Sequence, residues 1–208
     1  MSSPPLLLAY EDYKYLLNRG YNRKPALDLV VSRYNLSQKE RLFLYRCVHS
    51  DEEIEEVKRK LVTEPRELSV DGYNIALTLI SLKDGRAYEC DDGFVRDVQM
   101  GKRKGDPRIL EELRAVCEFL RSKGVNFVIL LDSQVSMSGE LAKTLREDGC
   151  NAVTSKTADK ESLTTGTTIA TNDFVLLIKS KSVFNLVKAM GFNPVPLSEV
   201  LSGGVPLD

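Results

Sequence analysis

From residue 67 onward, short apolar segments alternate with segments that have the periodicity of amphipathic helices. The clearest apolar segment is Val125–Leu131, which follows a helical pattern from about Pro107 to Lys123 and a break at Gly124. Parallel strands need a crossover connection, usually a helix, so this alternation is typical of a parallel sheet covered on both faces. The pattern therefore predicts an α/β fold for residues 66–208.

The expected elements of this part follow from periodicity and from turn residues. Expected strands are Glu67–Val70, Arg86–Cys90, Val125–Leu131, Cys150–Thr154, Thr167–Ala170 and Pro194–Leu197, and expected helices are Ile75–Leu82, Pro107–Lys123, Ser138–Asp148, Asp159–Thr164 and Val183–Met190.

The first 65 residues have helical patterns only. Apolar residues recur at helical spacing in Tyr10–Arg19, after Pro25, and in the segment that follows Ser37. Ser37 and Glu40 match the capping box that starts many helices. We therefore predict a small all-helical domain at residues 1–65, linked to an α/β domain at residues 66–208.

The basic and aromatic residues concentrate in the helical part. Between Tyr10 and His49 the chain has eight Lys or Arg against four acids, a local charge of +4, and six of its eight tyrosines. The whole chain has a net charge of −1, so the remainder carries −5. A basic module rich in tyrosine fits a nucleic-acid interface. Equally, the tyrosines fit the core of a small helical domain with its basic residues in solvent.

The ionisable residues narrow the chemistry. There is one histidine, His49, and the four cysteines lie singly, without a C-x-x-C pair. This spacing disfavours a structural zinc site and predicts reduced thiols in a reducing compartment. Reactive groups are then expected to be carboxylates, and carboxylates without histidine partners favour Mg²⁺ or Mn²⁺.

Acidic residues follow several of the expected strands. Asp71, Asp132 and Asp173 each end a strand, and Asp159 begins a short helix after another strand. Because ligands of open parallel sheets bind beyond the carboxyl ends of the strands, we expect these four carboxylates to gather at one edge. Several carboxylates in one place repel each other unless a cation is bound, which predicts a divalent metal site. For any single aspartate, capping the next helix is the simpler role.

Short motifs that carry these aspartates resemble those of NYN-type nucleases in the PIN-like superfamily. VDGYN (70–74) is similar to the first-strand motif, LLD (130–132) to the central strand, TAD (157–159) to the A-D motif and ATND (170–173) to the T-N-D signature. The resemblance runs from Leu68 to Leu201, and the full chain resembles an uncharacterised, largely archaeal family in which a helical domain precedes a PIN-like one.

The resemblance implies a Rossmann-like parallel sheet and a metal-dependent nuclease that acts on RNA. Asp71, Asp132, Asp159 and Asp173 would be the catalytic metal ligands for Mg²⁺ or Mn²⁺, with Asn74 and Thr171 in supporting positions. The chain departs from simpler PIN domains by an insertion at 89–106, so that Asp92, Asp97 or neither would be the additional acid. Asp91-Asp92-Gly93 is also a common turn sequence, which favours a structural role over a catalytic one.

RNA is the expected partner, and basic residues in both parts of the chain are candidates to bind it. The candidates are Arg19, Arg23, Lys24, Arg33 and Arg41 in the helical part and Lys102, Arg103 and Lys104 in the basic loop within the insertion. Phosphate contacts would come from these cations, and tyrosines would stack on unpaired bases.

The expected function is therefore an endoribonuclease in which a metal-activated water attacks the phosphodiester. The alternative is a non-catalytic RNA-binding or ribosome-associated protein with a PIN-like fold. A phosphatase with an aspartate nucleophile is disfavoured, because Asp71-Gly72-Tyr73 lacks the D-x-D pattern.

The remaining features concern location. The apolar runs are far shorter than the roughly 20 residues that span a bilayer, and the segment MSSPPLLLAYEDY lacks the basic start of a secretory signal. We therefore expect a cytoplasmic protein without membrane contact.

Overall fold

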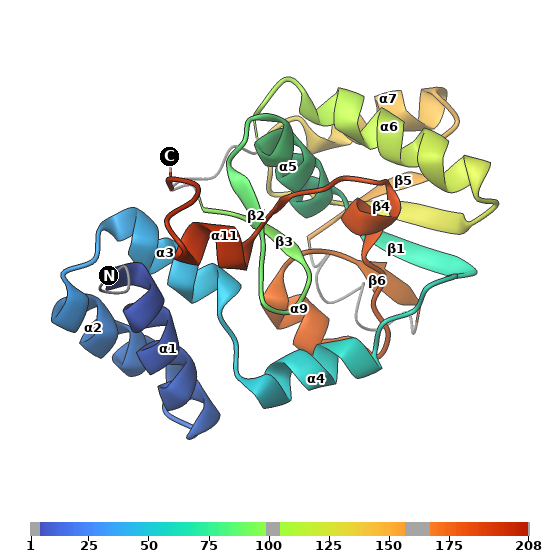
Figure 1. The fold of residues 1–208 in the computed structure, drawn as a ribbon. Helices are drawn as coiled ribbons and strands as arrows, with labels where there is room; N and C mark the ends of the chain where they lie inside the picture. The colour runs from blue at the N-terminus through green and yellow to red at the C-terminus, as the bar shows by residue number, and fades with distance from the viewer. Residues whose placement is uncertain (1–4, 99–104, 157–166, 208) are drawn as a thin grey trace.

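A four-stranded parallel sheet forms the centre of the molecule. The computed structural model describes residues 5–98, 105–156 and 167–207 (Figure 1). The sheet has the order β5-β4-β1-β6. Its strands are β1 (Glu67–Asp71), β4 (Asn126–Asp132), β5 (Ala152–Ser155) and β6 (Thr168–Ala170). The α/β architecture expected for residues 66–208 is confirmed.

The strand order contains a reversal beside β1. The chain builds outward from β1 to β4 and β5, and then returns to place β6 on the other side of β1. In register, Asp71 lies opposite Leu130 of β4, and Val70 lies opposite Ala170 of β6. In open parallel sheets, ligands bind outside the carboxyl ends of the strands at such a reversal. The carboxyl ends of β1 and β6 therefore mark the place where a site is expected.

Helices cover the sheet. Figure 1 shows α5 (Gly72–Lys83), α6 (Ile109–Ser122) and α7 (Ser138–Glu147) on one side and α9 (Phe174–Lys179) on the other. The main core cluster joins the apolar faces of α5, α6 and α7 to β1 and β4. The short α10 (Leu186–Ala189) contributes Leu186 and Val187 to the same cluster.

A second, smaller sheet replaces two of the expected members of the parallel sheet. Strand β2 (Ala87–Glu89) pairs antiparallel with β3 (Val95–Asp97) and parallel with β7 (Val195–Pro196), and α11 (Leu197–Leu201) follows. The expected strands near residues 86–90 and 194–197 thus exist, but the expectation that they belong to the parallel sheet was wrong. Periodicity identifies a strand and does not specify its partners.

The N-terminal part is all helical, as expected. It contains α1 (Pro5–Asn18), α2 (Arg23–Tyr34), α3 (Gln38–Cys47) and α4 (Asp51–Arg59). The capping box at Ser37 is confirmed, and Ser50 forms a second one at the start of α4.

The helical part shares its core with the rest of the chain. Tyr13 and Phe43 lie in one cluster with Tyr88 of β2 and Val200 of α11, and Val57 of α4 packs with Leu177 of α9. Since side chains from both parts fill the same clusters, the packing is continuous across the expected boundary at residue 65. That boundary stays a prediction.

All four cysteines form disulfides, so the prediction of reduced thiols was wrong. Cys47 at the end of α3 is bonded to Cys90 after β2, and Cys117 of α6 is bonded to Cys150 before β5. The partners are 43 and 33 residues apart, so no local spacing signals them. The first bond fastens the helical part to the second sheet.

No helix within the described residues is long and apolar enough to cross a membrane.

Gly72 is the point of closest approach between α5 and the sheet. A Cβ atom at this position would lie 2.7 Å from Leu131 Cδ2, 2.8 Å from Ile129 Cγ2 and 3.0 Å from the Leu130 carbonyl oxygen. The residue after Asp71 must therefore be glycine for the helix to start against the sheet.

Gly72→Ala is expected to lower the free energy of unfolding by about 1–3 kcal/mol, because overpacking forces neighbouring atoms to move. Gly139→Ala is the matched control: Gly139 lies in α7 with no atom within 4 Å of its added Cβ, so we expect a change between zero and about 1 kcal/mol of stabilisation. Urea unfolding of both variants measures the difference. Equal stabilities would contradict the close approach.

Candidate active site at the carboxyl edge of the parallel sheet

Asp71 joins the ends of β1 and β6. It closes β1 and caps α5, where its Oδ1 accepts a hydrogen bond from the Asn74 backbone N–H at 3.4 Å. Its Oδ2 accepts a hydrogen bond from Thr171 Oγ1 at 2.8 Å. This contact crosses the reversal in strand order and fixes the orientation of the Asp71 carboxylate.

The segment 171–173 is held by several hydrogen bonds. The Asp173 backbone N–H donates to Thr171 Oγ1 at 3.1 Å, and the Asn172 N–H donates to Asn74 Oδ1 at 2.7 Å. The Asp173 carboxylate caps α9 by accepting from Leu176 N at 3.1 Å. Asn74 and Thr171 were expected in supporting positions. Their hydrogen bonds connect the segment that carries Asp173 to Asp71 and to the start of α5. Asp173 itself is exposed and forms no ion pair with the described residues.

Asp132 lies at the end of the neighbouring strand. Its Oδ1 accepts from the Gln134 backbone N–H at 2.9 Å. Burial raises the pKa of Tyr73, the second residue of α5, and the negative charge of Asp132 raises it further. Asp71 and Asp132 thus end β1 and β4, and Asp173 follows shortly after the end of β6.

These carboxylates share an edge without forming one tight cluster. Among the described residues, the oxygens of Asp71, Asp132 and Asp173 do not all lie within 4.8 Å of one another. Mg²⁺ usually keeps several waters and is bound by one or two carboxylates together with substrate phosphates, so the spacing is compatible with such a site. Asp159, the fourth expected ligand, lies outside the described residues.

The two candidates for an additional acid are already engaged by arginines. Asp92 is buried, accepts from Arg96 Nη1 at 2.9 Å and Nη2 at 2.5 Å, and also accepts from the Phe94 backbone N–H. Asp97 is paired with Arg46 of α3. A carboxylate that already binds a guanidinium is a poor ligand for a metal ion, so these contacts favour the structural role of the Asp91-Asp92-Gly93 turn.

Arg96 is a functional candidate that sequence reasoning missed. Besides its ion pair, its Nε donates to the Asn172 carbonyl oxygen at 2.8 Å. The Asn172 backbone is therefore held on one side by Arg96 and on the other by Asn74. No motif signals this contact, because 76 residues separate the two partners.

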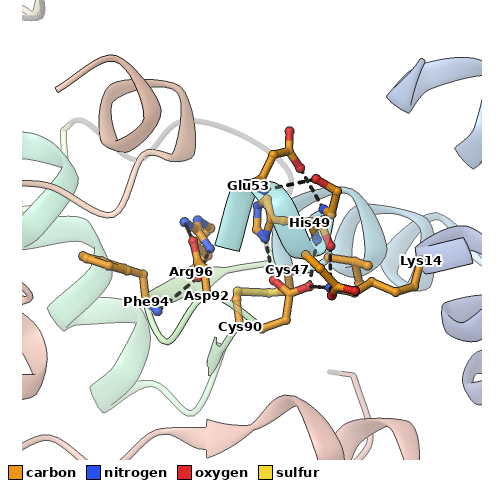
Figure 2. A network of polar contacts seen from close by, with 12 residues as sticks. Lys14, Cys47, His49, Glu53, Cys90, Asp92, Phe94 and Arg96 are labelled. Atoms are coloured by element: carbon orange, nitrogen blue, oxygen red, sulfur yellow. Dashed lines mark hydrogen bonds and ion pairs between the residues drawn. A yellow bond between two sulfur atoms is a disulfide. The ribbon is translucent and has the colours of Figure 1, made fainter. Parts of the chain in front are cut away.

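His49 supports the same segment from the helical part. Its ring stacks on Phe174, the residue after Asp173, with centroids 3.8 Å apart. Its Nδ1 lies 2.6 Å from Asp91 Oδ1, and its backbone N–H donates to Asp91 Oδ2 at 2.8 Å. Lys14 completes the network, with Nζ 3.3 Å from Asp91 Oδ2 and 2.6 Å from the His49 carbonyl oxygen. Figure 2 shows His49, Lys14 and the Asp92–Arg96 pair around the Cys47–Cys90 disulfide.

This network satisfies the distance condition for a metal site but has an unfavourable charge. His49, Asp91 and Asp92 offer ligand atoms within 4.8 Å of one another. Lys14 and Arg96, however, lie at hydrogen-bonding distance from the two carboxylates. A metal ion there would have to displace or repel these cations, so a structural role fits the contacts better.

His49 is expected to stay neutral at pH values where an exposed histidine is protonated. Burial, and then the positive charge of Arg96, lower the pKa of His49 to about 3. The unfolded chain takes up this proton near pH 6.5 and the folded chain does not, so the contribution of His49 to stability decreases as the pH falls below about 6.5.

NMR of the ring nitrogens checks this prediction without overlap, since His49 is the chain's single histidine. The ring should remain neutral at pH 5 in the folded protein and titrate near pH 6.5 in urea. Burial raises the pKa of Asp91, whose protonation favours the folded state, so the ring signal isolates His49 better than an unfolding curve. A folded-state midpoint near pH 6.5 would contradict the prediction.

The expected RNA-binding cations differ in their availability. Arg23 donates to the carbonyl oxygens of Tyr45 and Val48 and pairs with Glu53, so it fastens α2 to α3 and α4. Arg33 is paired with Asp12, and Arg41 with Asp28. Arg19 and Lys24 are exposed and form no ion pair with the described residues. Lys102, Arg103 and Lys104 lie outside the described residues.

The tyrosines of the helical part also differ in how far they are exposed to solvent. Tyr13 is fully buried in the core, as the packing alternative expected. Tyr15, Tyr21 and Tyr45 are exposed on the surface.

Two parts of the chain match protein families, and a protein of similar sequence is known. Residues 5–60 match the family described as "Protein of unknown function (DUF434)", and residues 62–189 match "Domain of unknown function (DUF5616)". "Uncharacterized protein MJ0935" of Methanocaldococcus jannaschii is 40% identical over 146 residues, which cover 67% of this chain and 70% of that protein. No solved structure matches the chain. The chain therefore belongs to the DUF5616 family, with a segment of the DUF434 type before the matched domain.

Proposed function

We propose that the protein is a divalent-metal-dependent phosphodiesterase with a PIN-like fold that cleaves RNA endonucleolytically. The observation that supports this function best is the hydrogen bond from Thr171 to Asp71 across the reversal in strand order, with Asp173 directly beside it. Exposed or half-buried carboxylates at this position are suited to hard cations and, through them, to phosphate oxygens.

The residues divide into ligands and orienting groups. Asp71, Asp132 and Asp173 would hold Mg²⁺ or Mn²⁺, with Asp159 as the fourth proposed ligand. A bound ion of this kind lowers the pKa of a water molecule and stabilises charge on the leaving oxygen. Thr171 keeps the Asp71 carboxylate in one orientation by donating to it, and Asn74 keeps the segment 171–173 in place.

A second candidate function is a non-catalytic RNA-binding or ribosome-associated protein with the same fold. The observation that favours it is that Asp71 and Asp173 also cap α5 and α9. If capping were their whole role, metal ions would have no specific effect on the protein.

We also propose a cytoplasmic location. The two disulfides do not oppose it, because intracellular proteins of hyperthermophilic archaea are rich in disulfides. The similar protein from Methanocaldococcus jannaschii is consistent with an archaeal family.

Metal dependence separates the two candidate functions. Mn²⁺ should raise the free energy of unfolding by about 2.7 kcal/mol at 100 times its Kd, because it binds the folded state. The same Mn²⁺ should be required for internal cleavage of a labelled RNA, and EDTA should abolish both effects. RNA binding without stabilisation or cleavage by Mn²⁺ or Mg²⁺ would support the non-catalytic alternative.

A further inference from the structure

Four side chains around the α1–α2 turn form an exposed aromatic and basic surface. They are Tyr15 and Arg19 at the end of α1, Tyr21 in the turn and Lys24 at the start of α2, and we call them the Tyr15–Lys24 surface. The two tyrosines are 58% and 61% exposed. Arg19 lies 5.1 Å from the ring centre of Tyr15. Large aromatic side chains this exposed contribute little to the core.

The charge of this surface is not compensated by neighbouring acids. No acid occurs between Asp12 and Asp28 in the sequence. The nearest acids of α4 are already engaged, since Asp51 is paired with Lys14 and Glu53 with Arg23. Arg19 and Lys24 form no ion pair with the described residues. The surface therefore presents positive charge and aromatic faces together, which is complementary to a polyanion with exposed bases.

The surface is connected to the aspartate edge. Arg23, which directly precedes Lys24 in the chain, places its guanidinium 5.5 Å from the ring centre of Phe174. Phe174 directly follows Asp173 in the chain. A second connection runs through α4: Asn18 of α1 donates to Asp51 at the start of this helix, and α4 packs against α9. Figure 1 shows the helical part beside the α/β part, with α4 passing below α9. Arg23 and α4 thus link the α1–α2 turn, which carries this surface, to the segment that carries Asp173.

We propose that the Tyr15–Lys24 surface binds single-stranded RNA and directs it to the aspartate edge. This inference rests on the proposed function. Tyrosine stacks on a base only when the base is unpaired, whereas cations alone hold single and double strands alike. The combination of Tyr15 and Tyr21 with Arg19 and Lys24 therefore selects the single strand.

The test measures binding separately from cleavage. Fluorescence anisotropy in EDTA, with a labelled unstructured oligoribonucleotide and the same strand annealed to its complement, gives Kd over a range of salt concentrations. Tyr21→Ala is expected to weaken binding of the single strand about 5- to 100-fold, and Tyr21→Phe is expected to retain it, because stacking needs the ring and not the hydroxyl. The duplex should bind more weakly than the single strand, with little response to Tyr21→Ala.

The charge contribution has its own matched control. Arg19→Gln/Lys24→Gln should reduce the slope of log Kd against log salt by about 1.4, since each phosphate contact on a single strand contributes about 0.7. Lys123→Gln/Lys188→Gln removes the same charge from exposed positions at the end of α6 and on α10, and should leave the slope unchanged.

The outcomes separate this inference from the proposed function. Binding that depends on Tyr21, with no cleavage in Mn²⁺, supports the surface and contradicts the nuclease. Cleavage with unchanged Kd in Tyr21→Ala and Arg19→Gln/Lys24→Gln overturns the inference alone. Equal affinity for duplex and single strand, or no RNA binding at low salt, also overturns it and favours a protein partner for this surface.

Discussion

Asp71→Asn is expected to lower the rate of Mn²⁺-dependent RNA cleavage by about 100-fold or more. Asparagine has nearly the same shape, and its side-chain oxygen can accept either the Asn74 or the Thr171 hydrogen bond, so the fold is retained. What is lost is the negative charge that would bind the metal. Loss of a residue that only orients a metal ligand already reduces metal affinity or activity about 10- to 100-fold. Loss of a ligand itself should therefore reduce the cleavage rate by about 100-fold or more. Initial rates on a labelled RNA measure the change.

Two variants bracket this prediction. Thr171→Val removes the hydroxyl that orients Asp71 but keeps every proposed ligand, so we expect an intermediate loss of about 10- to 100-fold. Glu118→Gln removes one negative charge from an exposed position on α6 and should leave the rate unchanged. If Asp71→Asn cleaves as fast as Glu118→Gln, the carboxylate is not a ligand and its role is structural, through contacts such as those with Asn74 and Thr171.

The sequence could locate the edge of the sheet because strand ends are a local property. Val70 and Asp71 are followed by Gly72, and this order marks both the end of β1 and the start of α5. The same reasoning placed Asp132 and Asp173 at strand ends. The structure confirms this for Asp132, which ends β4, whereas β6 ends at Ala170 and Asp173 caps α9. Parallel strands point the same way, so their ends share an edge whatever their order in the sheet. The distances between the carboxylates depend on packing, and no local pattern specifies them.

The parts that the sequence could not supply all depend on pairs of residues distant along the chain. Cys47 and Cys90 are bonded across 43 residues, and Arg96 meets Asn172 across 76. His49 shows the same limit: as a single histidine without a motif it had no assigned role, yet it stacks on Phe174 beside Asp173. Such contacts follow from the tertiary arrangement of elements, and a single sequence contains no periodic or spacing signal for them.

Arg96→Ala is expected to lower the free energy of unfolding by about 3–5 kcal/mol. The Asp92 side chain is 0% exposed and that of Arg96 is 7% exposed, so removing the guanidinium leaves a buried carboxylate without its counter-ion. The Asn172 carbonyl oxygen also loses its donor, which loosens the segment that carries Asp173. Urea unfolding measures the loss, and the ring signal of His49 should titrate at higher pH because the nearby positive charge is gone.

The position of the ion pair, and not the loss of an arginine as such, determines this effect. Arg114 forms a similar pair with Asp148 at 2.7 Å, but its side chain is 47% exposed, so Arg114→Ala should cost less than about 1 kcal/mol. Asp92→Leu/Arg96→Met removes both charges and should recover most of the stability lost in Arg96→Ala. The double variant still lacks the donor to Asn172, and we therefore expect it to fold while cleaving RNA more slowly than the wild type. Full activity in a stable double variant would show that Arg96 acts only on the core and not on the segment beside the aspartates.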